Sequence, residues 1–394
     1  MAKRIFFGSS ALAIKSKYVS GFASDGTETT TEGQWVVPRG IQSVGFSTSV
    51  AFEPMFQLGQ TEVYGRMESQ SPQVECTISK AIDGSQMLYT TLNGGHAAAN
   101  NKAPAELASN EVQIALGVYA ESVPYASGST QAAVHCSGMY VSNLQIQLPL
   151  DGVATEQLTL VGDTRRWLDS TNPIAAEIGN TAGERGVIGS GSAPSAYQRW
   201  TLDTAGSTLP LGVKDYPLQS VNVTMSIGRE VIQELGTRGK YCRYATFPFE
   251  VTSEFEVIAG KHRTGTDGVT GNDQAIVVSG YDFRNYAGYA CASADVYSTL
   301  SDGTPDPLGA NGVNGGEIDG GFRDQEIKIK LCGATTSDHL IIDLGTKNRV
   351  TSVNYAGGDT GGGNVTLTYS FQNYNYLQLN GSGSYAANPT ITWA

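Results

Sequence analysis

The feature that most constrains the fold of this chain is an internal repeat. Residues 41–74, IQSVGFSTSVAFEPMFQLGQTEVYGRMESQSPQV, align without a gap on residues 218–251, LQSVNVTMSIGREVIQELGTRGKYCRYATFPFEV, so the offset between the copies is constant (218 − 41 = 177). Ten of the 34 aligned positions are identical, including a Leu-Gly pair and a Tyr-x-Arg element near the middle. A repeat of this kind indicates a structural unit that the chain uses more than once, so we expect a tandem duplication of one domain.

A second pair of segments supports the duplication. Residues 142–162 and 351–371 each combine two stretches of alternating polarity with a turn rich in glycine and aspartate. The distance from the first repeated segment to this hairpin is 101 residues in the first copy (142 − 41) and 133 in the second (351 − 218), which predicts an insertion in the second copy. The expected boundaries are 1–179 for the first domain, 180–205 for a linker or exposed loop, 206–394 for the second domain and about 262–325 for its Gly/Asp-rich insertion.

Apolar and polar residues alternate in several stretches, as in strands of a sheet with one buried and one wet face. The polar positions are mostly uncharged Gln, Thr, Ser and Asn. This pattern predicts an all-β fold. The clearest such stretches are 144–148, 221–227, 327–331 and 365–371.

A short helix is expected in the middle of each repeated segment, where EPMFQLG and REVIQELG cluster their apolar residues on one side of a helical turn. In this interpretation the leucines are core anchors, and the glycines end the helix in the left-handed conformation that glycine adopts without a Cβ penalty. These repeat anchors are Leu58, Gly59, Leu235 and Gly236.

The Tyr-x-Arg elements that follow are harder to explain as core. Their side chains alternate along an extended segment, where they can stack or pair at an interface between subunits, with an ordinary surface as the alternative. The candidate inter-subunit residues are Tyr64, Arg66, Tyr241 and Arg243.

The charge of the chain excludes some functions. It has a net charge of −12 and an isoelectric point near 4.8, whereas proteins that grip nucleic acid through its phosphates are basic. No apolar run approaches the roughly 20 residues of a membrane-spanning helix. We therefore expect neither tight DNA binding nor membrane insertion.

Catalytic motifs are missing as well. The sequence contains no GxSxG, HExxH or Walker A motif, and the glycine-rich GGDTGGG at 357–363 lies inside a predicted hairpin, where a wide turn is expected. Asp/Asn/Gly clusters at 265–273 and 302–320 lack the spacing of an EF-hand loop but leave a Ca²⁺ site open. We expect no enzyme activity, no cofactor and no metal centre.

Three segments resemble the tail tube proteins of tailed bacteriophages. They are GIQSVGFSTSVAFEPMFQLGQTEVYGRMESQSPQVECTISKAIDG, YPLQSVNVTMSIGREVIQELGTRGKYCRYATFPFEVTSEFEV and GGDTGGGNVTLTYSFQNYN, which lie in two portions of the chain. The resemblance implies that each copy is a β-sandwich or partial barrel with one short helix. In that family, six domains form a ring whose strands join into an inner β-barrel, and stacked rings conduct DNA during ejection.

The resemblance implies a structural virion protein of the tail, assembled in the host cytoplasm. Two fused domains per chain imply a trimer with pseudo-sixfold symmetry. The implied partners are further copies of the chain, the tail terminator, the distal tail or baseplate proteins, and a sheath protein if the tail is contractile. Phage DNA would pass through the lumen without specific binding, next to the uncharged polar faces.

Other functions remain open at this point. A distal tail or baseplate hub protein uses similar paired domains but stops at one ring. A capsid or surface decoration protein is also β-rich and acidic but forms no hollow stack. A carbohydrate-active enzyme, with carboxylates in the glycine-rich insertion, is the third alternative.

Overall fold

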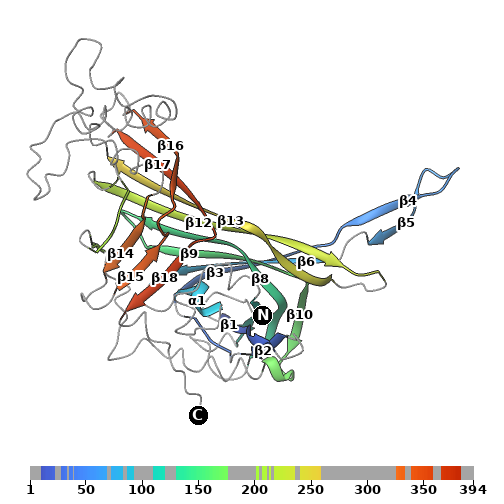
Figure 1. The fold of residues 1–394 in the computed structure, drawn as a ribbon. Helices are drawn as coiled ribbons and strands as arrows, with labels where there is room; N and C mark the ends of the chain where they lie inside the picture. The colour runs from blue at the N-terminus through green and yellow to red at the C-terminus, as the bar shows by residue number, and fades with distance from the viewer. Residues whose placement is uncertain are drawn as a thin grey trace, which may run out of the picture.

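A computed structural model shows an all-β chain, as predicted, with eighteen strands and one helix over the residues that it describes (Figure 1). We call 10–175 the first half and 201–382 the second half. The described residues are 10–22, 28–32, 35–38, 40–68, 72–82, 87–92, 110–119, 130–175, 201–203, 206–210, 213, 217–235, 240–258, 325–332, 339–357 and 365–382.

Eight antiparallel strands form a central sheet that runs through both halves. Their order is β3–β6–β9–β8–β12–β13–β17–β16, so the first four belong to the first half and the last four to the second. The bounds are β3 Ile41–Ser49, β6 Gln73–Ala81, β8 Ala132–Pro149, β9 Thr155–Gly162, β12 Leu218–Gln233, β13 Lys240–Ile258, β16 Arg349–Ala356 and β17 Thr366–Tyr374.

Each half adds a flanking sheet. The first has the order β10–β8–β7–β1–β2 and uses the N-terminal part of the long strand β8; the second has the order β11–β14–β15–β18. The bounds are β1 Ser10–Phe22, β2 Glu28–Glu32, β7 Glu111–Val118, β10 Thr164–Asp169, β11 Thr201–Leu202, β14 Lys328–Cys332, β15 His339–Asp343 and β18 Gln378–Ser382. Because β11 pairs with β14, the second half already begins inside the segment expected as a linker at 180–205. The insertion expected at about 262–325 lies outside the described residues except for its last position.

The two halves pair their central strands in the same register. All eight pairs of β3–β6 recur in β12–β13 with both partners displaced by the offset of the sequence repeat, so that Val44–Ile78 corresponds to Val221–Phe255. The pairs of β6–β9 and β8–β9 recur in β13–β17 and β16–β17, where Asn373 is the counterpart of Gly162 on β9 and Arg349 that of Tyr140 on β8. Each half of the central sheet therefore has the same order and register.

The alternating stretches bury their apolar residues as predicted, because one face of the central sheet packs against the flanking sheets in a common core. In the second half, the ring of Phe255 meets that of Phe371 edge to face with centroids 5.7 Å apart. Full burial of such a side chain contributes about 1.5–3 kcal/mol. In the first half, β1 and the helix α1 (Leu88–Leu92) cover the same face.

The core of the first half contains a buried charged pair at positions that are apolar in the second half. Lys80 and Glu156 are both fully buried and lie directly opposite each other on β6 and β9. The two carboxylate oxygens of Glu156 accept the N–H groups of Leu88 and Tyr89 at 2.6 and 2.7 Å, which fixes the start of α1. Burial raises the pKa of Glu156, against the opposing pull of Lys80 and these two N–H groups.

The short helices predicted at the middle of each repeat are wrong. Residues 52–56 form strand β4, which pairs with β5 (Val63–Glu68), and the matching residues of the second half continue β12 to Gln233. Cross-strand pairing overrides the local helical pattern there, and a two-stranded ribbon has an open edge on which Pro54 needs no N–H donor. We call 52–68 the first arm and the matching 229–245 the second arm.

Leu58, Gly59 and Leu235 lie at the tips of these arms rather than in the core. Leu58 and Leu235 are fully exposed, so their assignment as core anchors is wrong. Gly59 does adopt a left-handed conformation, with φ of 88°, but in a hairpin turn closed by a 3.1 Å bond from the Gln60 N–H to the Gln57 carbonyl. Gly236 lies outside the described residues.

Within the described part of the chain, no helix has the length and apolar character needed to cross a membrane.

Candidate subunit interface

The two halves are joined by a seam between β8 and β12. Seven antiparallel pairs form it, from Asn143–Ser226 to Pro149–Ser220, with Ile146 opposite Val223 at the centre. Each half thus offers one edge strand to the other, and main-chain hydrogen bonds make the sheet continuous.

The outer strands of the central sheet are the counterparts of the strands that meet at this seam. β3 corresponds to β12 and β16 corresponds to the C-terminal part of β8, by the registers given above. Among the described residues, β3 pairs only with β6 and β16 only with β17, so each has one strand edge without a partner strand. Transferring the seam register to these edges would place Phe46 opposite Tyr355.

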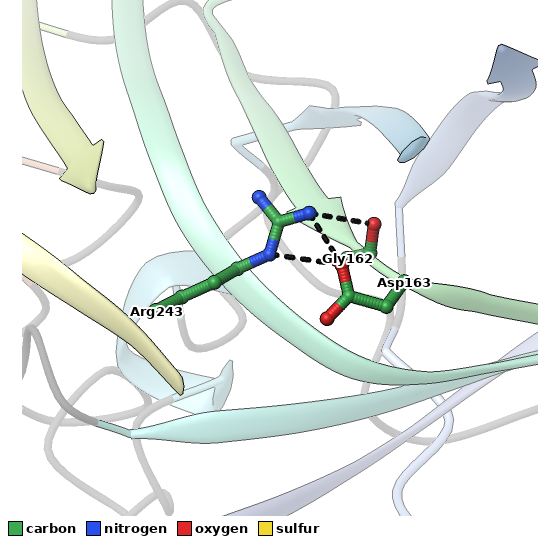
Figure 2. Close-up of polar contacts among 3 residues, drawn as sticks. All are labelled: Gly162, Asp163 and Arg243. Carbon is green, nitrogen blue, oxygen red and sulfur yellow. Dashed lines mark hydrogen bonds and ion pairs between the residues drawn. The ribbon is translucent and has the colours of Figure 1, made fainter. Parts of the chain in front are cut away.

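Arg243, on the second arm, crosses the seam. Its Nε donates to Asp163 at 3.1 Å and its Nη2 donates to the Gly162 carbonyl at 3.0 Å, at the end of β9 in the other half (Figure 2). The guanidinium also forms an ion pair with Asp163 and is buried, whereas the carboxylate is partly exposed. Arg243 therefore anchors the second arm to the first half.

Arg229 makes a parallel contact from the opposite strand of the second arm. Its Nε and Nη2 donate to the Val141 carbonyl at 3.0 and 2.7 Å, and its guanidinium lies 5.2 Å from the centroid of the Tyr140 ring. Burial lowers the pKa of Arg229 to about 10, so the side chain remains charged at neutral pH. A cation over a tyrosine ring contributes about 0.5–2 kcal/mol.

The first arm has the same strand pairing as the second arm, but it is exposed. All five pairs of β4–β5 recur in the second arm at the offset of the sequence repeat, with Phe52 in the place of Arg229 and Arg66 in the place of Arg243. Every residue of β4 is exposed, and the arm projects away from the body of the molecule (Figure 1). Its exposed apolar side chains are Phe52, Met55, Phe56, Val63, Tyr64 and Met67.

The four candidate interface residues have different surroundings. Arg243 binds the other half of its own chain, while Tyr64 and Arg66 are exposed on the first arm. The main chain of Tyr241 lies in β13, and its side chain is outside the described part. Whether any of them touches another subunit stays a prediction.

Sequence reasoning missed Arg229, Tyr140 and Asp163. Arg229 replaces an apolar residue in the alignment, so identity between the repeats could not indicate it. Asp163 follows the second strand of a predicted hairpin, and the pairing of a lone arginine with an aspartate 80 positions away leaves no local pattern.

The face of the central sheet that points away from the core is polar. It is built mainly from Ser, Thr, Asn and Gln of alternate positions, with Ser220 bonded to Glu256 at 3.0 Å and Gln372 to Glu250 at 2.7 Å. Its charged side chains on the inner strands β6 and β13 are glutamates. They are Glu75, Glu250, Glu254 and Glu256.

No cluster of His, Cys, Asp and Glu suited to a metal ion occurs among the described residues. His135 and Cys136 lie on opposite faces of β8: His135 contacts the Trp35 ring and Gln113, whereas Cys136 is in the main core. The Asp/Asn/Gly clusters at 265–273 and 302–320 fall outside the described part.

Comparison with known proteins gives structural similarity only. No protein-family model and no curated protein matches the chain. A solved structure of the tube-terminating cap of the anti-feeding prophage is similar at 13% identity and a TM-score of 0.27, covering 43% of this chain and 93% of its own. The anti-feeding prophage baseplate matches at 9% identity and 0.26, covering 44% and 100%. The SPP1 tail tube matches at 11% and 0.29, covering 48% and 97%.

Proposed function

We propose that this protein is a structural subunit of a phage tail tube, in which three chains close a ring around a DNA-conducting lumen. The observation that carries the proposal is the pair of outer strands of the central sheet. β3 and β16 are the counterparts of β12 and β8, which already pair within the chain. A second copy of the chain can therefore extend the sheet by repeating a junction that the protein makes internally.

Ring closure follows from the chemistry of strand edges. An edge strand presents unpaired N–H and C=O groups to any matching edge, and closure into a barrel removes every such edge. If the step between neighbouring halves is the same at every junction, six halves, and hence three chains, complete the pseudo-sixfold ring that the sequence resemblance implies. The proposal treats the two halves as copies of one domain with boundaries near 1–179 and 206–394, to the second of which the structure adds β11 (Thr201–Leu202).

The polar face of the central sheet suits a DNA channel. A basic wall would hold DNA through many phosphate contacts and slow its passage. The uncharged amides and hydroxyls, together with Glu75, Glu250, Glu254 and Glu256, outnumber the one exposed arginine of β16, Arg349, and give DNA little such attraction. A structural role also agrees with the lack of catalytic motifs in the sequence.

Electron microscopy and native mass measurement of the purified protein test the proposal. We expect hollow rings of three chains that stack into tubes of uniform bore. Rings that never stack would favour a baseplate hub, and compact trimers without a lumen would favour a decoration protein. Rings of six chains, or a strongly basic lumen, would contradict the proposal.

A further inference from the structure

Two contacts hold the second arm on the first half, and both have counterparts at the ends of the central sheet. Arg229 lies over the ring of Tyr140. By the shared registers of the two halves, the counterpart of Arg229 is Phe52 and that of Tyr140 is Arg349. The cation and the ring have exchanged places: the second arm carries the cation, and the first arm carries the ring.

We propose that the first arm docks on the second half of a neighbouring chain, where Phe52 packs against the guanidinium of Arg349. This inference rests on the proposed ring. Phe52 is 56% exposed and Arg349 is exposed at the start of the edge strand β16. A guanidinium over an aromatic face is favourable whichever side of the interface supplies the cation. The exchange therefore keeps a contact between a guanidinium and an aromatic ring. The arm supplies the ring instead of the cation, and the strand that it docks on supplies the cation instead of the ring.

Cross-strand geometry brings a second residue to the same face of the arm. Directly opposed residues of an antiparallel pair point to one face, and Phe52, Pro54 and the partner of Pro54, Arg66, share it. The same face of the second arm carries Arg229 and Arg243 and lies against the first half. On the first arm this face is open to solvent.

Arg66 has a matching seat on the neighbouring chain. The carbonyl that accepts Arg243 within the chain corresponds to that of Asn373, one residue before the exposed Tyr374. Tyr374 is the counterpart of Asp163, whose carboxylate pairs with Arg243. Arg66 would therefore donate to a main-chain carbonyl and lie beside an aromatic ring, without an ion pair. This makes the contact between chains weaker than the contact within a chain.

An exchange of residues tests the Phe52–Arg349 contact. The variants are Phe52→Arg, Arg349→Tyr and the two combined, and the readout is the apparent dissociation constant of the ring, measured by mass photometry over a dilution series. Phe52→Arg sets two guanidinium groups against each other, and we expect ring dissociation to increase by about tenfold or more. The double variant restores an arginine over a tyrosine, as in the Arg229–Tyr140 pair, and should return the constant to within about threefold of the unchanged protein.

Met55→Arg is the matched control. Met55 lies on the same strand as Phe52 but on the opposite face of the arm, next to Gly65. Met55→Arg adds the same charge as Phe52→Arg, but on the face that does not contact the neighbouring chain. Rings of this variant should therefore remain as stable as those of the unchanged protein. Equal weakening by Met55→Arg and Phe52→Arg would overturn the assignment of the docking face.

The outcomes separate the two proposals. If the unchanged protein forms no ring, the proposed function fails and the docking contact with it. If the unchanged protein forms three-chain rings but the double variant is no more stable than Phe52→Arg, the function stands and the contact is overturned. Circular dichroism of each variant establishes that the chain has folded, which is expected because both positions are exposed.

Discussion

The two halves of the central sheet share one register but fill it with different chemistry. At the position where the first half buries Lys80 opposite Glu156, the second half has Val257 opposite Leu367. Register thus survives the replacement of a charged pair by an apolar one. The backbone pairing is common to both halves, whereas the side chains that fill the core differ between them.

A second position shows the opposite change, in which an apolar contact in the first half corresponds to a polar pair in the second. Met139 packs against Gly162 in the first half, where a Cβ on the glycine would lie 2.1 Å from the methionine sulfur. The counterparts in the second half are Asn348 and Asn373, joined by a 2.7 Å hydrogen bond. Asn348 also donates to the carbonyls of the corner between β15 and β16, where the first half has the single strand β8. The polar pair accompanies a break in the strand.

The largest effect is expected from the buried charges. Glu156→Leu leaves Lys80 buried without its carboxylate and removes the acceptor of two N–H groups, so we expect a loss of about 3–5 kcal/mol in the free energy of unfolding. The combination Lys80→Val with Glu156→Leu copies the second half and should lose less than Glu156→Leu alone. Urea denaturation of the monomeric chain measures both. A double variant that loses as much stability as Glu156→Leu alone, or more, would show that the pair is not coupled.

The two arms provide the next comparison. Arg243→Ala breaks two charge-assisted hydrogen bonds and a partly screened ion pair, and it should cost about 2–3 kcal/mol in the unfolding of the single chain. Arg66→Ala, at the matching position of the exposed arm, should leave that unfolding free energy unchanged. Its effect should appear only in ring assembly. Equal destabilisation of the single chain by both variants would show that the arms are not in different environments.

Gly162 gives a steric test of the first half. Gly162→Ala forces the sulfur of Met139 to move, and we expect a loss of about 1–3 kcal/mol as in other overpacked cores. Gly45→Ala is the control, because a Cβ there meets no atom within 4 Å. Thermal unfolding of both variants measures the difference. An unchanged melting temperature for Gly162→Ala would mean that the methionine relaxes freely.

The smallest effect concerns pH. Burial and the positive charges of Arg166 and Lys15 lower the pKa of His135 in the fold, where it contacts the Trp35 ring. The unfolded chain therefore binds the proton first, so the stability contributed by neutral His135 is full above about pH 6.5 and is lost as the pH falls below it. The pairs of β8–β10 recur in β15–β18, and by this register the counterpart of His135 in the second half is the apolar Leu344. Comparing the pH dependence of unfolding for the unchanged chain and His135→Gln checks this, since the variant should lack that decline.

Much of the fold could be predicted from the sequence because the patterns that specify it are periodic. The constant offset of the repeat predicts the recurrence of a pairing register, and alternation predicts which side chains are buried. Both depend on backbone geometry that neighbouring residues share. The helices were predicted wrongly because the clusters around Leu58 and Leu235 satisfy a helical period over only one turn, while strand pairing extends through them.

The candidate interface was less accessible. Arg243 was singled out because it recurs as Arg66, but its partners lie on another strand and follow from the fold alone. The exchange of Arg229 and Tyr140 for Phe52 and Arg349 is invisible in an alignment, where both positions look unrelated. The proposed compensation follows only from the register, which indicates the residues that would meet.

The bulges at the start of β3 and β12 have a consequence for the shape of any closed sheet. Each contains one extra residue, Gln42 or Gln219, whose amide donates to the carbonyl two residues earlier. An extra residue at the same place in both halves adds the same stagger between neighbouring strands. Stagger and strand number together determine the tilt and radius of a barrel. Deleting Gln42 alone would make alternate halves tilt differently, so the ring would lose its even cross-section while its individual contacts remained.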